Sequence, residues 1–289
     1  MTAKTNQQVL DMIGRGDTLS TLSFLVDLEA DADSALGLNQ ALYTNGKDAR
    51  ERAEAARVRL LEQLPSLAGN DLAAMVFTLG CIALYQDDVL EAVTRFKEVL
   101  ALQPGNAMAL HNLAYANELL AEFQEARDYY EQALAQNPNQ TLTRLNLALL
   151  DLADAEYEKS LEVLHALHAV DPGNLGLTLY LCRGLLLRGT TRDLEEVQEL
   201  TEHTEGALDF LYVRECRANA LFLLGETEAA EAAFIQLLEE NPDNVFALTG
   251  RIKLLAANNA FSELGDYVRR LHALAPSEAM TELLEAVNG

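Results

Sequence analysis

Small and large apolar residues recur along the chain with a period of 34 residues. Each unit has a small residue, a second small residue and then a large apolar residue four positions further on. The clearest sets are Gly80, Ala92 and Phe96; Ala114, Ala126 and Tyr130; and Ala148, Ser160 and Leu164. Small residues recur where two antiparallel helices approach closely, and the large side chain fills the space beside them. The pattern therefore predicts a series of helical hairpins.

Prolines mark the boundaries between these units. They stand at positions 65, 104, 138, 172, 242 and 276, and they keep one phase of 34 residues with insertions of five and two residues. Proline stops a helix and seldom lies inside one. Two positions after three of these prolines come Asn106, Asn174 and Asn244, which can accept hydrogen bonds from the first free amides of a following helix. Each proline thus predicts the end of one hairpin and the beginning of the next.

These units resemble the tetratricopeptide repeat, whose signature includes a leucine–glycine pair, an alanine, an aromatic residue and a terminal proline. The match is strong over residues 73–174 and good over 211–244, and the units elsewhere are degenerate. The resemblance implies an all-α fold, a right-handed superhelical solenoid of six or seven hairpins. We expect a single solenoid over residues 1–289, in which each hairpin is stabilised mainly by its neighbours.

The expected solenoid has five segments. They are degenerate N-terminal hairpins over 1–66, three regular repeats over 73–174, a degenerate repeat over 175–210, two repeats over 211–276 and a capping helix over 277–289. Departures from the signature at both ends suit capping units, which need a polar outer face because nothing stacks on them.

The resemblance also implies that the first helix of every hairpin lines a concave groove, through the second, fifth, sixth, ninth and twelfth positions of each unit. From these positions we predict a partner-binding set of Phe77, Cys81, Met108, His111, Asn112, Tyr115, Leu142, Leu145, Asn146, Leu149, Leu179 and Arg183. The same positions further along the chain include Leu186, Tyr212, Glu215, Cys216, Asn219, Phe222, Phe246 and Gly250.

Four leucines of this set, at positions 142, 145, 149 and 179, form an apolar stripe. Monomers seldom leave a contiguous apolar patch uncovered, so we expect an amphipathic helix or apolar peptide of a partner to fill it. The alternatives are a terminal segment of the same chain, a second copy of the chain, or a rotated helix phase that makes these leucines part of the core.

Asn112 and Asn146 resemble the family's asparagine ladder, whose amides hold the backbone of an extended peptide. The alternative is that each asparagine bonds within its own hairpin. Some family members grip the C-terminal carboxylate of chaperones with a lysine and an asparagine at the fifth and ninth positions. Here those positions carry Phe77 with Cys81, or His111 with Tyr115, so chaperone-tail binding is disfavoured.

Charge narrows the choice of partner. The chain has 45 acidic and 21 basic residues and a net charge of −24, which opposes binding to nucleic acid or to an anionic membrane surface. Residues 151–243 hold 20 of the acidic residues and six of the basic ones. A solvated outer face explains this excess, and an attractive surface for a basic protein is the functional alternative.

The remaining composition points to a cytoplasmic protein. We find no secretory signal and no apolar run of about 18 residues that would span a membrane. The three cysteines, Cys81, Cys182 and Cys216, form no CxxC pair, and their odd number argues against a closed disulfide framework.

Candidate chemistry is sparse. His165 and His168 stand three residues apart, but no third metal ligand accompanies them at a recognisable spacing, so no metal site is predicted. Cys81 and His111 occupy neighbouring first helices and would suit a nucleophile and a base, although cysteine is commonly a small buried hydrophobe. We find no phosphate-binding loop, serine elbow or paired-carboxylate motif, and predict no catalytic residue, no cofactor and no enzyme activity.

The leading hypothesis is therefore a non-enzymatic scaffold or adaptor that binds a partner peptide or amphipathic helix in an apolar concave groove. One alternative is a self-associating structural subunit, in which a homo-oligomer fills the leucine stripe. The other is a sensor or enzyme subunit that binds a metabolite or signalling peptide along a wall of Cys81, His111, Tyr115 and Arg183.

Overall fold

The structure, a computed structural model, describes residues 54, 57–58, 60–62, 64–202, 211–258, 260–276 and 281. The chain divides into two compact units, Met1–Leu150 and Asp151–Gly289, and each is described by itself. The single solenoid expected over residues 1–289 stays a prediction. Most of the hairpins predicted over 1–66, and all but one residue of the capping helix predicted over 277–289, lie outside the described residues.

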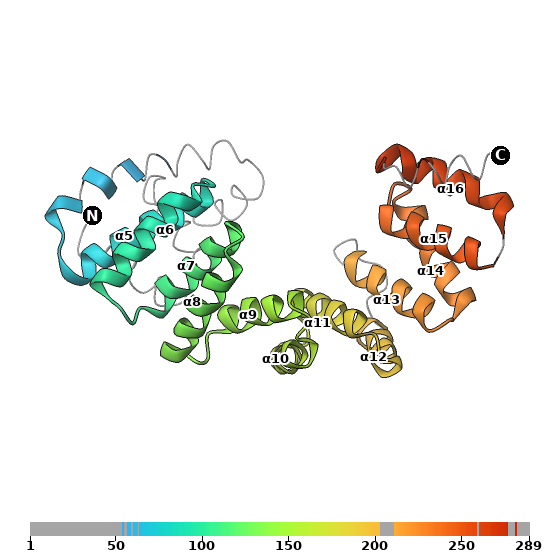
Figure 1. The fold of residues 1–289 in the computed structure, drawn as a ribbon, viewed down its shortest axis with the longest axis horizontal. Helices are drawn as coiled ribbons and strands as arrows, with labels where there is room; N and C mark the ends of the chain where they lie inside the picture. Colours follow the sequence, from blue (N-terminus) through green and yellow to red (C-terminus); the bar gives the residue numbers. More distant parts are fainter. Residues whose placement is uncertain are drawn as a thin grey trace, which may run out of the picture. The chain divides into compact units, whose positions relative to one another are not determined.

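The described residues form helices joined by short connections and contain no strand (Figure 1). After a short 3-10 helix at Leu64–Ser66 come α5 (Gly69–Tyr85), α6 (Val89–Leu102), α7 (Ala107–Leu119), α8 (Phe123–Gln136), α9 (Thr141–Ala153), α10 (Tyr157–Val170), α11 (Leu175–Arg188), α12 (Thr191–Thr201), α13 (Leu211–Leu223), α14 (Thr227–Glu240), α15 (Val245–Ala257) and α16 (Phe261–Leu274). The all-α prediction is confirmed.

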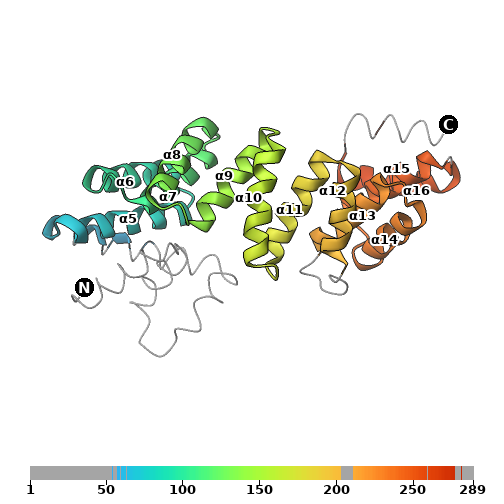
Figure 2. The ribbon, with the colours of Figure 1, turned by 90° about the horizontal axis from the view of Figure 1, so that it is seen from below.

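Consecutive helices pack in pairs, as a hairpin repeat requires. In the first unit α5 packs on α6 and α7 on α8; in the second, α11 packs on α12, α13 on α14 and α15 on α16 (Figure 2). The second helix of one pair also contacts the first helix of the next, as α6 contacts α7 and α14 contacts α15. First helices of successive pairs touch as well, so α11, α13 and α15 form a continuous row.

The helix boundaries lie where the prolines and asparagines predict them. Prolines 104, 138, 172 and 242 lie in the short connections that precede α7, α9, α11 and α15. Asn106, Asn174 and Asn244 are the N-caps of α7, α11 and α15, and each side-chain oxygen accepts a backbone N–H of the first turn at 2.8–3.2 Å. These caps satisfy amides that would otherwise lack a partner at a helix start.

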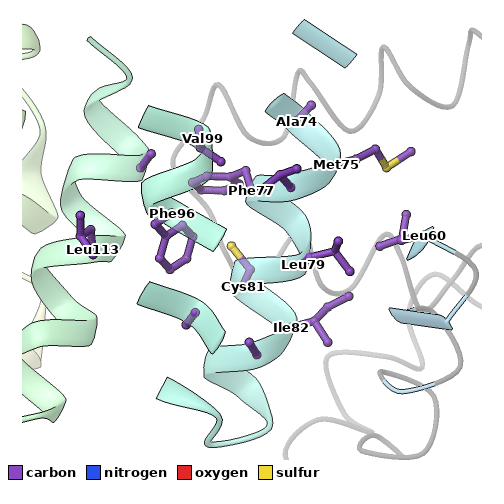
Figure 3. Packing of buried hydrophobic residues seen from close by; sticks show 14 residues of the cluster. Leu60, Ala74, Met75, Phe77, Leu79, Cys81, Ile82, Phe96, Val99 and Leu113 are labelled. Carbon is purple, nitrogen blue, oxygen red and sulfur yellow. The ribbon is translucent and has the colours of Figure 1, made fainter. Parts of the chain in front are cut away.

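Within a hairpin, a position without a side chain lets an aromatic ring reach the neighbouring helix. In the first pair, a Cβ at Gly80 of α5 would lie 2.7 Å from Cε1 of Phe96, which real Cβ atoms do not tolerate. Phe96 and Ala92 are buried, and the ring of Phe77 lies 5.6 Å from that of Phe96. Figure 3 shows the rings of Phe77 and Phe96 in the same buried cluster as Cys81.

A similar contact joins one hairpin to the next. Phe234 of α14 is buried, and its ring lies against Gly250 of the following helix, α15. A Cβ at position 250 would lie 2.8 Å from Cδ1 of Phe234 and closer still to Cε1 and Cζ. This glycine therefore sets how closely α15 approaches the hairpin before it.

The degenerate repeat over 175–210 forms the pair α11 and α12 with a turn of its own. Gly189 ends α11 with φ of 70°, and Thr190 and Asp193 form a capping box at the start of α12. Arg188 donates to both oxygens of buried Asp193 at 2.9 and 2.6 Å. These hydrogen bonds lower the pKa of Asp193 to about 2. A bidentate ion pair thus holds the turn where the repeat signature is missing.

Substitution of Gly250 by Ala tests the contact with Phe234. Gly→Ala in a helix usually stabilises by about 0.5–1 kcal/mol. Here we expect the free energy of unfolding to fall by about 1–3 kcal/mol, because the added methyl group overlaps a buried ring. Urea unfolding followed by circular dichroism measures the change. In a Phe234→Leu background the same substitution should cost little, and a stabilising Gly250→Ala in the native background would contradict the contact.

Candidate functional site

A pocket of about 490 Å³ opens on the row of first helices in the second unit. Its lining comes from α11, α13 and α15 and consists of Leu179, Arg183, Leu186, Leu187, Tyr212, Glu215, Cys216, Asn219 and Phe246. All of these except Leu187 stand at the groove positions identified in the sequence. The structure therefore brings together Leu179 and Arg183 of the predicted binding set with residues that the set omits.

The walls of the pocket are mainly apolar and partly open to water. Leu187 is 56% exposed and Tyr212 is 64% exposed, whereas Leu179, Leu186 and Phe246 are half-buried. The ring of Phe246 lies 6.0 Å from that of Phe234, the ring that Gly250 accommodates. The packing that joins the last two hairpins therefore also places one wall of the pocket.

The pocket's carboxylate has a structural partner. Glu215 accepts a hydrogen bond at 2.8 Å from Nδ2 of Asn244, which is buried and caps α15 through its Oδ1. Burial raises the pKa of Glu215, and the hydrogen bond from Asn244 opposes that rise. Glu215 thus ties α13 to the beginning of α15.

The pocket's cation has no such role. Arg183 of α11 is exposed and makes no hydrogen bond or ion pair with any residue that the structure describes. Cys216 beside it is 6% exposed, and burial raises the pKa of its thiol to about 12, although the Arg183 charge acts in the opposite direction. The thiol is therefore protonated at neutral pH, which does not suit a nucleophile.

In the first unit, the accessible members of the predicted set lie on α7 and α9. Tyr115 is 41% exposed and Leu142 is 52% exposed, while Met108, Leu145 and Leu149 are half-buried. Of the expected leucine stripe, only Leu142 is therefore largely open to water, and Leu179 lies in the pocket of the second unit.

Asn112 and Asn146 each bond to the preceding hairpin rather than within their own. Nδ2 of Asn146 donates to the Tyr130 hydroxyl at 2.9 Å, and that hydroxyl donates to Glu118 at 2.8 Å. Nδ2 of Asn112 donates to Sγ of Cys81 at 3.7 Å, and Asn112 is 5% exposed. In this arrangement both amides link neighbouring hairpins.

Phe77, Cys81 and His111 are mainly parts of the interior. Phe77 and Cys81 belong to the buried cluster of α5 and α6. His111 shares a hydrogen bond of 2.9 Å between its Nδ1 and the Thr143 hydroxyl, and burial lowers the pKa of His111 to about 4. The ring is therefore neutral at pH 7. The metabolite or signalling-peptide site hypothesised from the sequence has four residues, Cys81, His111, Tyr115 and Arg183. The first three lie in the first unit, whereas Arg183 lies in the second.

His165 and His168 have separate partners. Nδ1 of His165 lies 3.4 Å from Glu196, and Nε2 of His168 lies 3.2 Å from the Thr178 hydroxyl. Among the described residues, no three His, Cys, Asp or Glu side chains come together as metal ligands would. None of the described helices combines the length and apolar character that crossing a membrane requires.

Tyr130→Phe tests the link between hairpins in the first unit. The substitution removes the hydroxyl that bonds Asn146 and Glu118, so we expect the free energy of unfolding to fall by about 1–2 kcal/mol. Urea unfolding measures the free energy of unfolding of each variant. Tyr129→Phe is the matched control, since Tyr129 is half-buried on the same helix and makes no hydrogen bond to a described residue. Equal effects of the two substitutions would show that the hydroxyl network contributes nothing.

Known proteins and protein families are similar to this chain in the same repeats. Models of the tetratricopeptide repeat match residues 77–141 and 217–244. The chain is 24% identical over 222 residues to the N-terminal acetyltransferase A complex auxiliary subunit NAA15 of Arabidopsis thaliana. The match covers 72% of this chain and 24% of that protein, so the chain spans about a quarter of its relative's length.

Two solved structures share the fold at low sequence identity. A tetratricopeptide repeat protein from Parabacteroides merdae has a TM-score of 0.59 and 18% identity, over 99% of this chain and 98% of that one. A chain of the APC/C hetero-tetramer Cut9-Hcn1 has a TM-score of 0.65 and 15% identity, over 94% of this chain and 52% of that one. Repeat matches and fold together indicate a protein-interaction scaffold in general, and scaffolds of this kind are generally non-enzymatic. The chain therefore contains segments that match the tetratricopeptide repeat, over residues 77–141 and 217–244.

Proposed function

We propose that the protein is a non-enzymatic adaptor that holds an apolar segment of a partner protein against its first helices. The observation that carries the proposal is the pocket on α11, α13 and α15, whose lining residues, Leu187 excepted, stand at positions that the repeat register assigns to a binding face. Its volume of about 490 Å³ lies in the range of sites that accept a bound group.

The apolar lining supports this role energetically. Leu187 and Tyr212 expose more than half of their surface to water inside a concave site. Burial of such a side chain by a partner stabilises a complex by roughly 1.5–3 kcal/mol before ordering costs are subtracted. A few such contacts support micromolar binding, which suits an adaptor that takes up and releases its partner.

The first unit offers a second contact surface for the same partner or another. It consists of the accessible groove residues of α7 and α9, namely Met108, Tyr115, Leu142, Leu145 and Leu149. Phe77, Cys81 and Asn112 are buried and would act behind this surface by placing the helices.

The sulfur and imidazole groups support a binding role over a catalytic one. The thiols of Cys182 and Cys216 have pKa values raised by burial, and the imidazole of His111 has a pKa lowered by burial. All three cysteines are buried and lie outside any disulfide, which fits a reducing compartment such as the cytoplasm. The Arabidopsis relative is named as an auxiliary subunit of a complex, and we propose an auxiliary role of that general kind here.

Affinity capture from the native lysate tests the proposal, with the double variant Leu187→Ser, Tyr212→Ser beside the wild type. Both side chains are exposed, so their replacement should leave helicity unchanged while it removes apolar contact area. We expect a protein that the wild type retains and the variant loses. The matched control is Val170→Ser, Leu223→Ser, which replaces two exposed apolar residues of the same unit outside the pocket.

The control should retain what the wild type retains. Retention of the same proteins by all three forms, or of none by any, would contradict the pocket as the recruiting surface. In that case self-association, seen as a dimer in sedimentation, or a metabolite that raises the melting temperature would replace the adaptor hypothesis.

A further inference from the structure

We infer that the pocket of the second unit recognises an apolar side chain that is followed or preceded by an acidic one, with the acidic side chain paired to Arg183. This inference rests on the proposed function and adds the chemistry of the partner segment. The apolar side chain would lie among Leu186, Leu187, Tyr212 and Phe246, and the carboxylate would lie at Arg183 of α11.

The two charged groups of the pocket differ in whether the fold already engages them in a hydrogen bond. Glu215 bonds to buried Asn244 at 2.8 Å and so helps to place α15. Arg183 is exposed and makes no hydrogen bond or ion pair with a described residue. The charge that the fold leaves available for a ligand is therefore positive, and the complementary ligand group is an anion.

Arg183 lies in a part of the chain where acidic residues outnumber basic ones, so a basic side chain without an ion pair is unusual there. Residues 151–243 contain 20 acidic residues and six basic ones. Arg188 pairs with Asp193, Arg214 pairs with Glu240 and Lys159 pairs with Asp151. Three of the six basic residues are thus paired, whereas Arg183 lines a mainly apolar pocket and has no counter-ion among the described residues. An Arg guanidinium in that setting favours a carboxylate, which it can bind through two parallel hydrogen bonds.

The placement of the lining favours a side-chain carboxylate over the end of a chain. The pocket draws on three successive first helices, so an extended segment that contacts α11, α13 and α15 can present a side-chain carboxylate to Arg183 from within its length. Asn219 on α13, also in the lining, supplies an amide for the segment's backbone or for the same carboxylate.

Selection of short random peptides on the full-length protein tests the inference. The peptides are displayed with both ends joined to a carrier, so that no free carboxyl terminus is present. We expect wild-type protein to enrich peptides with Leu, Phe or Tyr at a fixed spacing from Asp or Glu. Fluorescence anisotropy with one selected peptide then compares wild type, Arg183→Glu and the matched control Arg192→Glu. Arg192 is exposed on α12 and lies outside the pocket.

Charge reversal at Arg183 should lower the affinity for the selected peptide by about tenfold or more, while Arg192→Glu should change that affinity little. A peptide with Lys in place of its acidic residue should bind the Arg183→Glu protein more tightly than it binds the wild-type protein. Because Arg183 makes no hydrogen bond or ion pair with a described residue, circular dichroism should show the same melting temperature for all forms.

Three results would overturn the inference and leave the adaptor function in place. The first is enrichment of apolar peptides without a fixed acidic position, and the second is equal loss of affinity in both charge-reversal variants. The third is enrichment only in a second library whose peptides end in a free carboxyl group, which would indicate a terminal carboxylate instead. If wild type enriches no peptide that the Leu187→Ser, Tyr212→Ser variant fails to bind, the inference and the proposed function both fail.

Discussion

The structure depends on the packing of an aromatic ring against a helix position that has no side chain. Phe96 fills the space over Gly80 within one hairpin, and Phe234 fills the space over Gly250 between two hairpins. Both rings are buried and cannot move aside without opening a cavity. Because Phe246 of the pocket wall packs on Phe234, the contact that holds the last two hairpins together also shapes the candidate site.

Much of the fold could be predicted from the sequence because its signals are local. A proline in a connection, an asparagine that caps the following helix and a small residue opposite a ring each act within one or two turns of helix. Those signals located α7, α11 and α15 and the pairing of helices. The turn between α11 and α12 could not be predicted, since it depends on how Arg188 reaches both oxygens of Asp193.

The candidate site was predicted less completely, for a physical reason. Position in the repeat places a residue on the first-helix face, but the neighbouring hairpins decide whether that residue meets water. Phe77 and Cys81 hold such positions and are buried, while Tyr212 holds another and is 64% exposed. The partners of Asn112 and Asn146 likewise come from the preceding hairpin. Leu187 lies outside the assigned positions altogether, and only the structure places it in the pocket.

The polar groups of the second unit divide into those that build the fold and those that remain available. Glu215, Asn244, Asp193 and Arg188 make hydrogen bonds that begin or end helices. Arg183 makes none with a described residue and lies beside exposed apolar side chains. A row of packed helices that presents a charge without a partner among the described residues, next to an apolar pocket, is suited to recognition because its geometry is set before the partner arrives.

Hydrogen–deuterium exchange of the full-length protein, with and without the proteins that it retains from lysate, tests the central claim most directly. If the first helices form the binding face, amide exchange should slow in α11, α13 and α15 and stay unchanged in α12, α14 and α16. Protection of the second helices, with the first helices unaffected, would contradict the account, because it would place the partner on the opposite side of each hairpin.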